Sequence, residues 1–298
     1  MANVVLRPTA SRRRSNFSVG ANQAQPSPSD AGTTVVWDTR TGGAQSIQGA
    51  ANLAAALSAA GFGGSPTVTS PSTLEWDAAD SLTIPGAPKV FKLTWTPDGT
   101  TEQQISLERG ITIAANKDVY MQWKRFQAAG FDNTPGFGRK NFVWFQNDNP
   151  QVRYALTLNS TDRVRLFRDG SPYSASDPTT VISSDDGSRA EARWSGAGGT
   201  SNDLPVPGPS DNSRHPDNYI GQIQTYTCRI KGESAGGAGD GQLETWFNGV
   251  LCDRRSGLYT SNLPWSSAFQ FGGPTWNYPA SGPYTEAVWD FVCWHKAL

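Results

Sequence analysis

The feature that most constrains this chain is a succession of short, alternating apolar and polar segments from about residue 70 to residue 298. Their β-branched and aromatic residues, and the turn residues between them, are typical of strands. The segments read SLTIPG, KVFKLTW, QQISLERGITI, DVYMQWKRF, KNFVWFQ, VRYALTL, DRVRLFRDG, QIQTYTCRIKG, QLETWFNGVLC and AVWDFVCWHK. So many strands with turns between them predict an all-β sandwich or barrel.

Side chains of a strand alternate between its two faces, and the segment KDVYMQWKRF shows this most clearly. On one face we expect Tyr120, Gln122, Lys124 and Phe126. On the other face we expect Met121, Trp123 and Arg125. Apolar residues are only 37% of the chain, but its eleven Trp, thirteen Phe and eight Tyr supply large side chains for a core.

Ahead of the strands, composition and pattern predict two further regions. Residues 1–30 are rich in Ser, Asn, Gln, Ala and Pro, which is typical of an extended arm. Residues 31–69 are expected to pack a first strand, TTVVWD at 33–38, and one short helix against the sandwich of residues 70–298.

The helix is predicted from the segment SIQGAANLAAALSAA at residues 46–60. Ser46 is the expected N-cap, and Gly61 is expected to end the helix. The residues expected to share its apolar face are Ile47, Ala50, Ala54 and Leu57.

Within the strand region, residues 171–218 form a long polar insertion. Loops longer than about 12–15 residues are usually functional or mobile. The insertion is therefore a candidate lid, interface or mobile loop.

Charge is unevenly distributed along the chain. Residues 1–29 carry Arg7, Arg12, Arg13 and Arg14 and no acidic residue, so with −1 overall the remainder carries −5. We expect these arginines to dock the arm onto an acidic partner surface, with a solvated tail as the alternative. Three or four cations are few for useful nucleic-acid affinity at physiological salt, which argues against a nucleic-acid partner.

Cysteine usage and the N-terminus bear on location. Cys228, Cys252 and Cys293 lie in apolar, strand-like segments and are expected to be small buried residues, with a disulfide between two of them as the alternative. The N-terminus lacks the apolar region of a secretory signal, and no segment reaches the roughly 18 apolar residues of a membrane helix. We therefore expect no membrane partner, and assembly in a host cytoplasm.

Several segments resemble one known superfamily. DVYMQWKRFQAAGF, GFGRKNFVWF, TYTCRIKGE and DGQLETWFNGVLCDRRSGLY, closed by FGGPTWNYP and AVWDFVCWHK, resemble the concanavalin A-like lectin/glucanase superfamily, and within it the polysaccharide-lyase jelly rolls. The resemblance covers about residues 70–298 and lies in strand order and turns rather than in a tight motif. It implies an antiparallel two-sheet jelly-roll sandwich whose concave sheet often carries a glycan groove. Members include lectins, hydrolases, lyases and viral structural domains, and the fold alone does not choose among them.

Catalytic signatures are weak in this chain. Retaining glucanases of the superfamily carry acids at alternating positions of one strand, whereas QLETWFNG has Glu244 alone and Trp246 where a second acid is expected. A lyase needs a base and a cation that neutralises a uronate carboxylate, and Arg125 and Tyr226 are candidates of these types. Both residues also fit as packed strand residues, and the paired motifs of alginate lyases are absent.

Aromatic side chains suggest a glycan site, because rings can stack on sugars. Trp276 and Tyr278 lie in the loop-rich segment LPWSSAFQFGGPTWNYP. Trp123 and Trp246 alternate with polar residues and are expected to line one face. The candidate glycan-binding residues are therefore Trp123, Arg125, Glu244, Trp246, Trp276 and Tyr278.

No metal or cofactor is predicted. The two histidines, His215 and His295, form no cluster with zinc spacing. Calcium prefers several oxygen ligands from loops, and it is the alternative that the sequence leaves open. Its candidate ligands are Asn147, Asp148, Asp185 and Asp186.

Three classes of function remain open. The arm, the jelly-roll resemblance and the lack of a catalytic signature or export signal favour a non-enzymatic structural protein of a virion. A bacteriophage capsid decoration or tail-associated protein fits this description, with other virion proteins, further copies of itself and surface polysaccharide as expected partners. The alternatives are a lectin-like carbohydrate-binding protein and a polysaccharide lyase.

Overall fold

The computed structural model describes most of the chain in segments that form two β-sheets. The described residues are 24–63, 66–86, 88–96, 103–131, 138–139, 145–148, 151–159, 163–169, 191–193, 219–235, 238, 240–258, 268–276 and 282–298. For some of these residues only the backbone is described, and their side chains are not. They are the described residues between 138 and 193, residues 252–258 and 268–276, and residues 77–80, 103, 243 and 250.

One sheet, called sheet A, has eight strands and contains the two longest strands of the described chain. Its order is β14 (Val250–Leu258), β13 (Gly241–Phe247), β12 (Ile223–Lys231), β6 (Lys117–Gln127), β16 (Tyr284–Ala297), β4 (Lys89–Trp95) and β3 (Thr73–Ala78), with β1 (Thr33–Asp38) also paired to β16. Every neighbouring pair is antiparallel.

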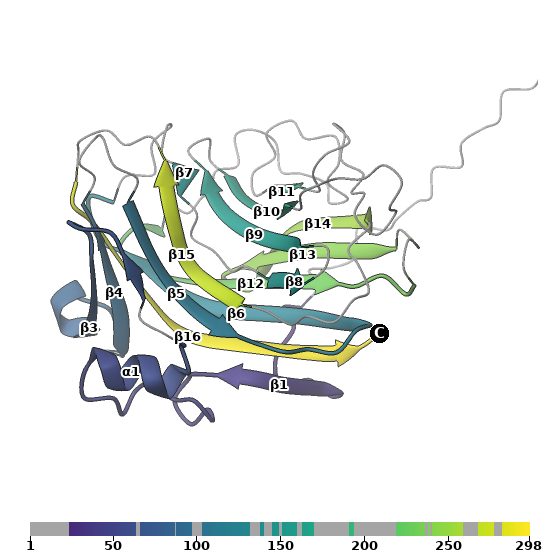
Figure 1. Ribbon diagram of the computed structural model, residues 1–298, viewed down its shortest axis with the longest axis horizontal. Coiled ribbons are helices and arrows are strands. Elements are labelled where there is room, and N and C mark those ends of the chain that lie inside the picture. The colour runs from purple at the N-terminus through teal and green to yellow at the C-terminus, as the bar shows by residue number, and fades with distance from the viewer. Residues whose placement is uncertain are drawn as a thin grey trace, which may run out of the picture.

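The second sheet, sheet B, also has eight strands and lies across the core from sheet A (Figure 1). Its order is β11 (Glu191–Arg193), β10 (Arg163–Asp169), β9 (Gln151–Asn159), β7 (Gly138–Arg139), β15 (Ala268–Trp276), β5 (Gln103–Gly110) and β2 (Thr67–Val68), with β8 (Phe145–Asp148) paired to β9. The predicted all-β, antiparallel two-sheet jelly-roll sandwich is therefore confirmed. Strands β1 and β2 show that residues 31–69 contribute to both sheets.

Strand β16 organises sheet A, because it pairs with β6 along one edge and with two different strands along the other. On that second edge, β4 pairs with Tyr284 to Val288, and β1 pairs with Val292 to Lys296. A β-bulge separates the two halves, and Asp290 within it has a positive φ of 55°. Bulges bend a strand and increase its twist, which allows one strand to serve two neighbours.

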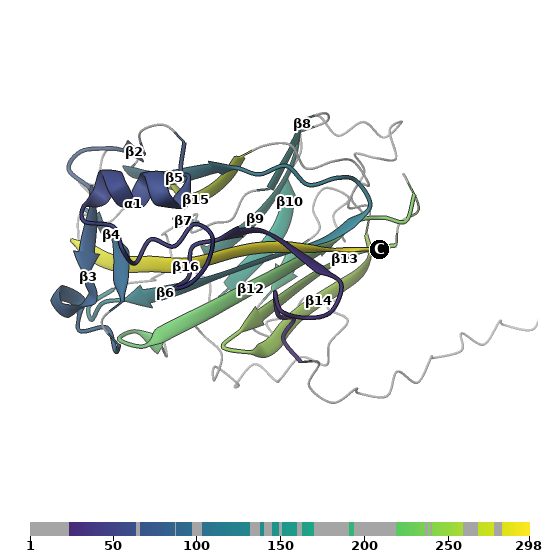
Figure 2. The same cartoon turned by 90° about the horizontal axis from the view of Figure 1, so that it is seen from below.

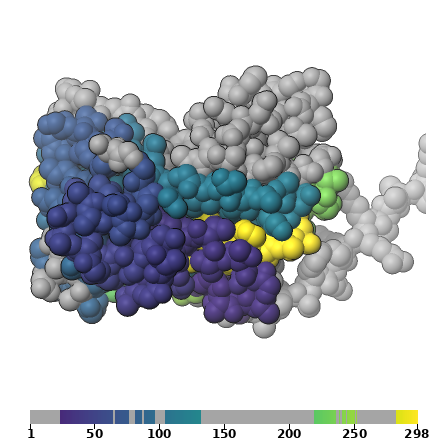
Figure 3. Space-filling model, turned by 60° about the horizontal axis from the view of Figure 1, so that its bottom comes forward, coloured from purple at the N-terminus to yellow at the C-terminus, as the bar shows by residue number. Residues whose placement is uncertain are grey.

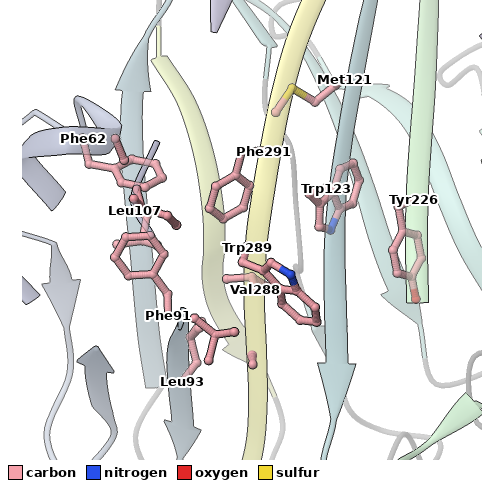
Figure 4. Close-up of a cluster of buried hydrophobic side chains, with 14 of the residues drawn as sticks. Phe62, Phe91, Leu93, Leu107, Met121, Trp123, Tyr226, Val288, Trp289 and Phe291 are labelled. Carbon is pink, nitrogen blue, oxygen red and sulfur yellow. The ribbon is translucent and has the colours of Figure 1, made fainter. Parts of the chain in front are cut away.

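The core between the sheets is dominated by aromatic side chains (Figure 4). Trp37 of β1 stacks on Phe291 of β16 with 5.4 Å between ring centroids, and Phe62 packs edge-on against both rings. Leu107 of sheet B belongs to the same cluster. Full burial of such side chains contributes roughly 1.5–3 kcal/mol each relative to exposure.

The helix begins later than predicted. Helix α1 spans Leu53–Ala60, so the predicted start at Ser46 is wrong, whereas the predicted end at Gly61 is confirmed by its left-handed φ of 69°. Asn52 is the N-cap, and its side chain accepts a hydrogen bond from the backbone N–H of Ala55 at 2.9 Å. Gly49 interrupts the segment before Asn52, and glycine is a poor residue for a helix interior.

The late start also changes the face that the helix buries. Its buried residues are Ala56 and Ala60, and Ala54 is exposed. The predicted apolar face of Ile47, Ala50, Ala54 and Leu57 is therefore wrong as a helical face. Ile47 and Ala50 are buried in the core, but they lie in the turns that precede α1.

The predicted strand SLTIPG is also wrong. A short 3-10 helix, η1 (Ala79–Leu82), is followed by a turn in which Thr83 and Gly86 have positive φ values of 58° and 84°. Pro85 has no N–H to donate to a strand ladder, which disfavours a strand here. The strand of this region is β3, which precedes η1 and pairs with β4.

Two of the three cysteines are buried free thiols, as predicted. Cys228 and Cys293 lie on either side of Met121, across the width of β6. Their Cα atoms are thus about two strand spacings apart, or roughly 9–10 Å, which is too far for a disulfide. Burial raises the pKa of the Cys228 thiol to about 12. The side chain of Cys252 lies outside the described residues.

The inner surface of sheet A also buries an ion pair. The side chains of Arg125 and Glu286 are each 1% exposed, and Arg125 Nη2 lies 2.6 Å from Glu286 Oε2. Trp95 Nε1 donates to the other carboxylate oxygen at 2.8 Å. The ring centroid of Phe131 lies 5.3 Å from the guanidinium carbon. Removal of one partner of such a pair leaves the other charge buried and uncompensated.

The change Glu286→Gln is expected to lower the free energy of unfolding by about 3–5 kcal/mol, because it leaves the Arg125 charge without its carboxylate. Denaturant unfolding followed by Trp fluorescence measures this loss. Glu75→Gln is the matched control, since Glu75 pairs with Lys92 at 2.9 Å but is 51% exposed. Its effect should stay below about 1 kcal/mol, and equal losses in the two variants would contradict the assignment.

The change Asn52→Ala is expected to lower the free energy of unfolding by about 1 kcal/mol, because it removes the side-chain oxygen that caps α1. The matched control is Ser46→Ala, which should change stability by less than about 0.5 kcal/mol because Ser46 lies outside the helix. Thermal or denaturant unfolding distinguishes the two positions. A larger loss at Ser46 than at Asn52 would restore the earlier helix start.

Candidate functional site

The register of sheet A divides its side chains between an inner surface, toward sheet B, and an outer surface. Residues directly opposite each other in an antiparallel pair project to the same side. Trp123 lies opposite Tyr226, and both belong to the core (Figure 4). Tyr120 lies opposite Arg229 on one side and Trp294 on the other, and it projects outward with them.

Four adjacent strands contribute to this outer surface, which we call the outer face. Its residues are Asp118, Tyr120 and Gln122 on β6, Thr227 and Arg229 on β12, Glu244 and Trp246 on β13, and Trp294 and Lys296 on β16. An outward surface of an antiparallel sheet is commonly solvated and polar. Here three large aromatic residues alternate with charged and amide side chains, and the rings are at most 5% exposed.

Arg229 holds the charged part of the outer face together. Its Nη1 lies 2.8 Å from Glu244 Oε2, and its Nη2 lies 2.6 Å from Asp118 Oδ2. Burial tends to lower the pKa of Arg229, but the hydrogen bond to Glu244 and the attraction of both carboxylates outweigh burial and raise that pKa. One guanidinium thus bridges carboxylates from β6 and β13 across β12.

Tyr120 and Trp294 form the aromatic part. Their rings are stacked with 5.2 Å between centroids and 5° between planes, and Val292 packs with them. The guanidinium of Arg229 and the ammonium of Lys296 lie 5.8 Å and 5.9 Å from the Tyr120 centroid. Burial, as the largest cause, raises the pKa of Tyr120 to about 12, so the phenol stays protonated at neutral pH.

Several buried polar atoms of the outer face have no hydrogen-bond partner among the described residues. They are the indole Nε1 atoms of Trp246 and Trp294, Nε of Arg229 and Oδ1 of Asp118. Buried polar groups almost always have a partner, so each such atom requires an explanation. Three donors and one acceptor therefore remain available on this face to a hydrogen-bonding ligand or to water.

Residues 24–32 cross the outer face before the chain enters β1 (Figure 2). Gln25 Nε2 donates to Thr227 Oγ1 at 2.7 Å, and the Asp30 carboxylate lies 3.2 Å from Lys296 Nζ. A hydrogen bond from the backbone of Ser27 is the main cause that lowers the pKa of Asp30. Figure 3 shows the purple N-terminal residues packed against the yellow residues of β16. Two polar contacts thus attach this segment to the face.

The structure brings together only some of the predicted site residues. Glu244 and Trp246 lie on the outer face, whereas Trp123 and Arg125 lie on the inner surface. The prediction that Trp123 and Trp246 line one face is wrong, because they lie opposite consecutive positions of β12, Tyr226 and Thr227.

The two lyase candidates are enclosed in the core. Arg125 is bound to Glu286, and the Tyr226 hydroxyl donates to Gln224 Oε1 at 2.5 Å. Each residue is 1% exposed. Neither side chain can reach a polysaccharide in this structure.

Seven of the nine residues of the outer face are not among the predicted site residues, and four of these form its ion-pair cluster and its stacked rings: Asp118, Tyr120, Arg229 and Trp294. The alternation in KDVYMQWKRF carries a signal for two of them, because it separates Asp118 and Tyr120 from the core residue Met121. The other two depend on how β12 and β16 align with β6, which one strand alone does not specify.

The remaining predictions fall where side chains are not described. These residues are Trp276, whose backbone alone is described, Tyr278, Arg7, Arg12, Arg13, Arg14, Asn147, Asp148, Asp185, Asp186 and most of 171–218. Within the described residues, no group of three or more His, Cys, Asp or Glu side chains is placed to bind a metal. No described helix is long and apolar enough to span a membrane.

Neither a protein-family description nor a curated protein matches this chain. Among solved structures, the chain is similar to an endo-β-1,4-glucuronan lyase from the fungus Trichoderma reesei, with 11% identity and a TM-score of 0.47 over 78% of this chain and 90% of that chain. The cellulose-induced protein Cip1 has 16% identity and a TM-score of 0.40 over 76% and 90% of the two chains. The botulinum neurotoxin serotype C1 binding domain has 11% identity and a TM-score of 0.45 over 89% and 49%. At these identities, and with TM-scores below 0.5, the similarities assign no function to this chain.

Proposed function

We propose that this chain is a carbohydrate-binding protein and that the outer face of sheet A is its glycan site. The observation that carries the proposal is the set of buried polar atoms without partners beside three aromatic rings on one face. Ligand sites combine aromatic walls with a few convergent polar groups that fix orientation. Sugars suit this combination because their C–H surfaces pack on rings while their hydroxyls both donate and accept.

The charges of the outer face favour a ligand that has many hydroxyls over one that has a net charge. Arg229 already contacts two carboxylates, and Lys296 contacts Asp30. A ligand carboxylate would have to compete with these internal partners. Hydroxyls can instead use Trp246 Nε1, Trp294 Nε1 and Asp118 Oδ1 without breaking either ion pair of Arg229.

The same geometry favours binding over catalysis. A lyase base must remove a proton near neutral pH, but the Tyr120 phenol has a pKa of about 12. Glu244 and Asp118 both accept hydrogen bonds from one guanidinium, whereas a glycosidase needs a separate acid and nucleophile. The outer face therefore lacks the poised acid and base that polysaccharide cleavage needs.

Ligand access requires movement of the chain that covers the face. Trp294 is fully buried and Tyr120 is 5% exposed, although both lie on the outward side of the sheet. Within the part of the chain that the structure describes, two polar side-chain contacts attach residues 24–32 there. A hydrogen bond and a partly exposed ion pair contribute about 1 kcal/mol each, so displacement of the segment by a glycan is energetically feasible.

The change Trp246→Phe is expected to weaken glycan binding about fivefold, because it keeps a ring but removes the Nε1 donor. A panel of neutral and acidic oligosaccharides identifies a ligand, and calorimetry then measures its affinity for the variant. Trp76→Phe is the matched control, since its indole N–H bonds to Ala50 O at 3.2 Å, away from the outer face. Equal affinity in all three proteins, or no ligand in the panel, would overturn the proposal.

The virion role stays a prediction of the sequence, and the proposed glycan site is compatible with it. The virion role depends on the arginines of the N-terminal arm, which lie outside the described residues. Light scattering on full-length and arm-deleted protein, at low and high salt, tests it. Salt-sensitive oligomers that disappear on deletion are the expected result, and monomers under every condition would remove self-assembly through the arm.

A further inference from the structure

Gln25 is the residue of the N-terminal segment that contacts a polar side chain in the middle of the outer face. Its carboxamide Nε2 donates to Thr227 Oγ1 at 2.7 Å. Thr227 is fully buried, and its hydroxyl oxygen also accepts from Gln122 Nε2 at 3.0 Å. A threonine hydroxyl in the middle of sheet A is therefore already used as an acceptor for amide N–H groups.

The neighbouring position on β13 offers the complementary group. Trp246 lies directly opposite Thr227, is 1% exposed, and its Nε1–H has no partner among the described residues. The carboxamide oxygen of Gln25 lies 3.5 Å from the point where a Cβ would stand at Gly249. Gly249 has a φ of +83°, so glycine is favoured there, and the space beside the carboxamide stays open. An amide in this place finds an acceptor for its N–H in Thr227, and the residue opposite Thr227 on β13 carries an N–H donor that has no partner among the described residues.

From this arrangement we propose that Thr227 and Trp246 form a subsite for the acetamido group of a 2-acetamido sugar, and that Gln25 occupies it when no ligand is bound. The inference rests on the glycan-binding function proposed above. The Gln25 N–H stands in for the acetamido N–H on Thr227, and the N–H of Trp246 remains for the acetamido C=O of the ligand. A ring hydroxyl at the same position is smaller and fills less of the space that the carboxamide occupies.

Occupation by Gln25 makes the segment a competitor for the ligand. The apparent affinity of a site falls in proportion to the fraction of molecules in which it is free. Removal of the carboxamide should therefore strengthen binding of acetamido sugars. It should do so without an equal effect on sugars that lack the acetamido group, because these do not need the Thr227 acceptor.

Chitohexaose and cellohexaose test the subsite, because both have a β-1,4-linked backbone. They differ at C2, where chitohexaose has an acetamido group and cellohexaose has a hydroxyl. Calorimetry on the full-length protein should show tighter binding of chitohexaose. Gln25→Met keeps the length of the side chain and removes the amide, and it should raise chitohexaose affinity about fivefold. Thr227→Val should remove the preference for chitohexaose over cellohexaose.

The change Asp30→Asn serves as the control, because it weakens the second attachment of the same segment but keeps the Gln25 carboxamide. It should raise the affinities for both sugars by similar factors. If Asp30→Asn raises the chitohexaose preference as much as Gln25→Met does, loosening of the segment explains the effect and the subsite is overturned. Equal binding of both sugars in wild type and Gln25→Met overturns the subsite but leaves glycan binding standing. Binding of neither sugar, nor of any other glycan, in any of these proteins overturns both proposals.

Discussion

The alignment of β6 with its neighbours β12 and β16 is the constraint on which the rest of sheet A depends. A shift of one residue in a strand register moves every side chain to the opposite face. In the observed register, Met121 lies between Cys228 and Cys293 in the core, and Tyr120 lies between Arg229 and Trp294 outside it. The apolar residues of β6 on the inner side thus fix the position of the polar and aromatic residues on the outer side.

The two surfaces of sheet A pair their buried charges in different ways. On the inner side, Arg125 meets the single carboxylate of Glu286 among aromatic residues, and the pair is sealed from solvent. On the outer side, Arg229 meets two carboxylates from neighbouring strands, beside the stacked rings of Tyr120 and Trp294. The inner arrangement is closed, which suits a structural role. The outer arrangement leaves polar atoms available, which suits recognition.

Much of the fold could be predicted from the sequence, because strand periodicity is a local property. KVFKLTW and TTVVWD match β4 and β1 residue for residue, and KDVYMQWKRF differs from β6 by one residue. The helix start was less accessible, because both Ser46 and Asn52 are good capping residues and only the folded chain selects one. Element ends depend on competition of this kind between local signals.

The site was harder to predict than the fold, because it depends on pairing between distant segments. Glu244 and Trp246 could be identified from one strand, but Arg229 becomes their neighbour only through the β12–β13 register. Trp123 and Trp246 look alike in sequence, since each directly follows a polar residue. Their partners on β12 are consecutive residues, whose side chains point to opposite surfaces of the sheet. No single segment of the sequence contains this information.

The place of β16 in the sheet has a consequence for how the protein is made. Every other described strand of sheet A precedes β16 in the chain, yet β16 lies between β6 and the pair β4 and β1. While the ribosome is still translating the preceding residues, sheet A can exist only as separate pieces with open strand edges. Open edges are templates for pairing with other chains, and distant pairings form slowly. Nascent chains on the same messenger RNA are therefore most exposed to misassembly in the interval before β16 emerges.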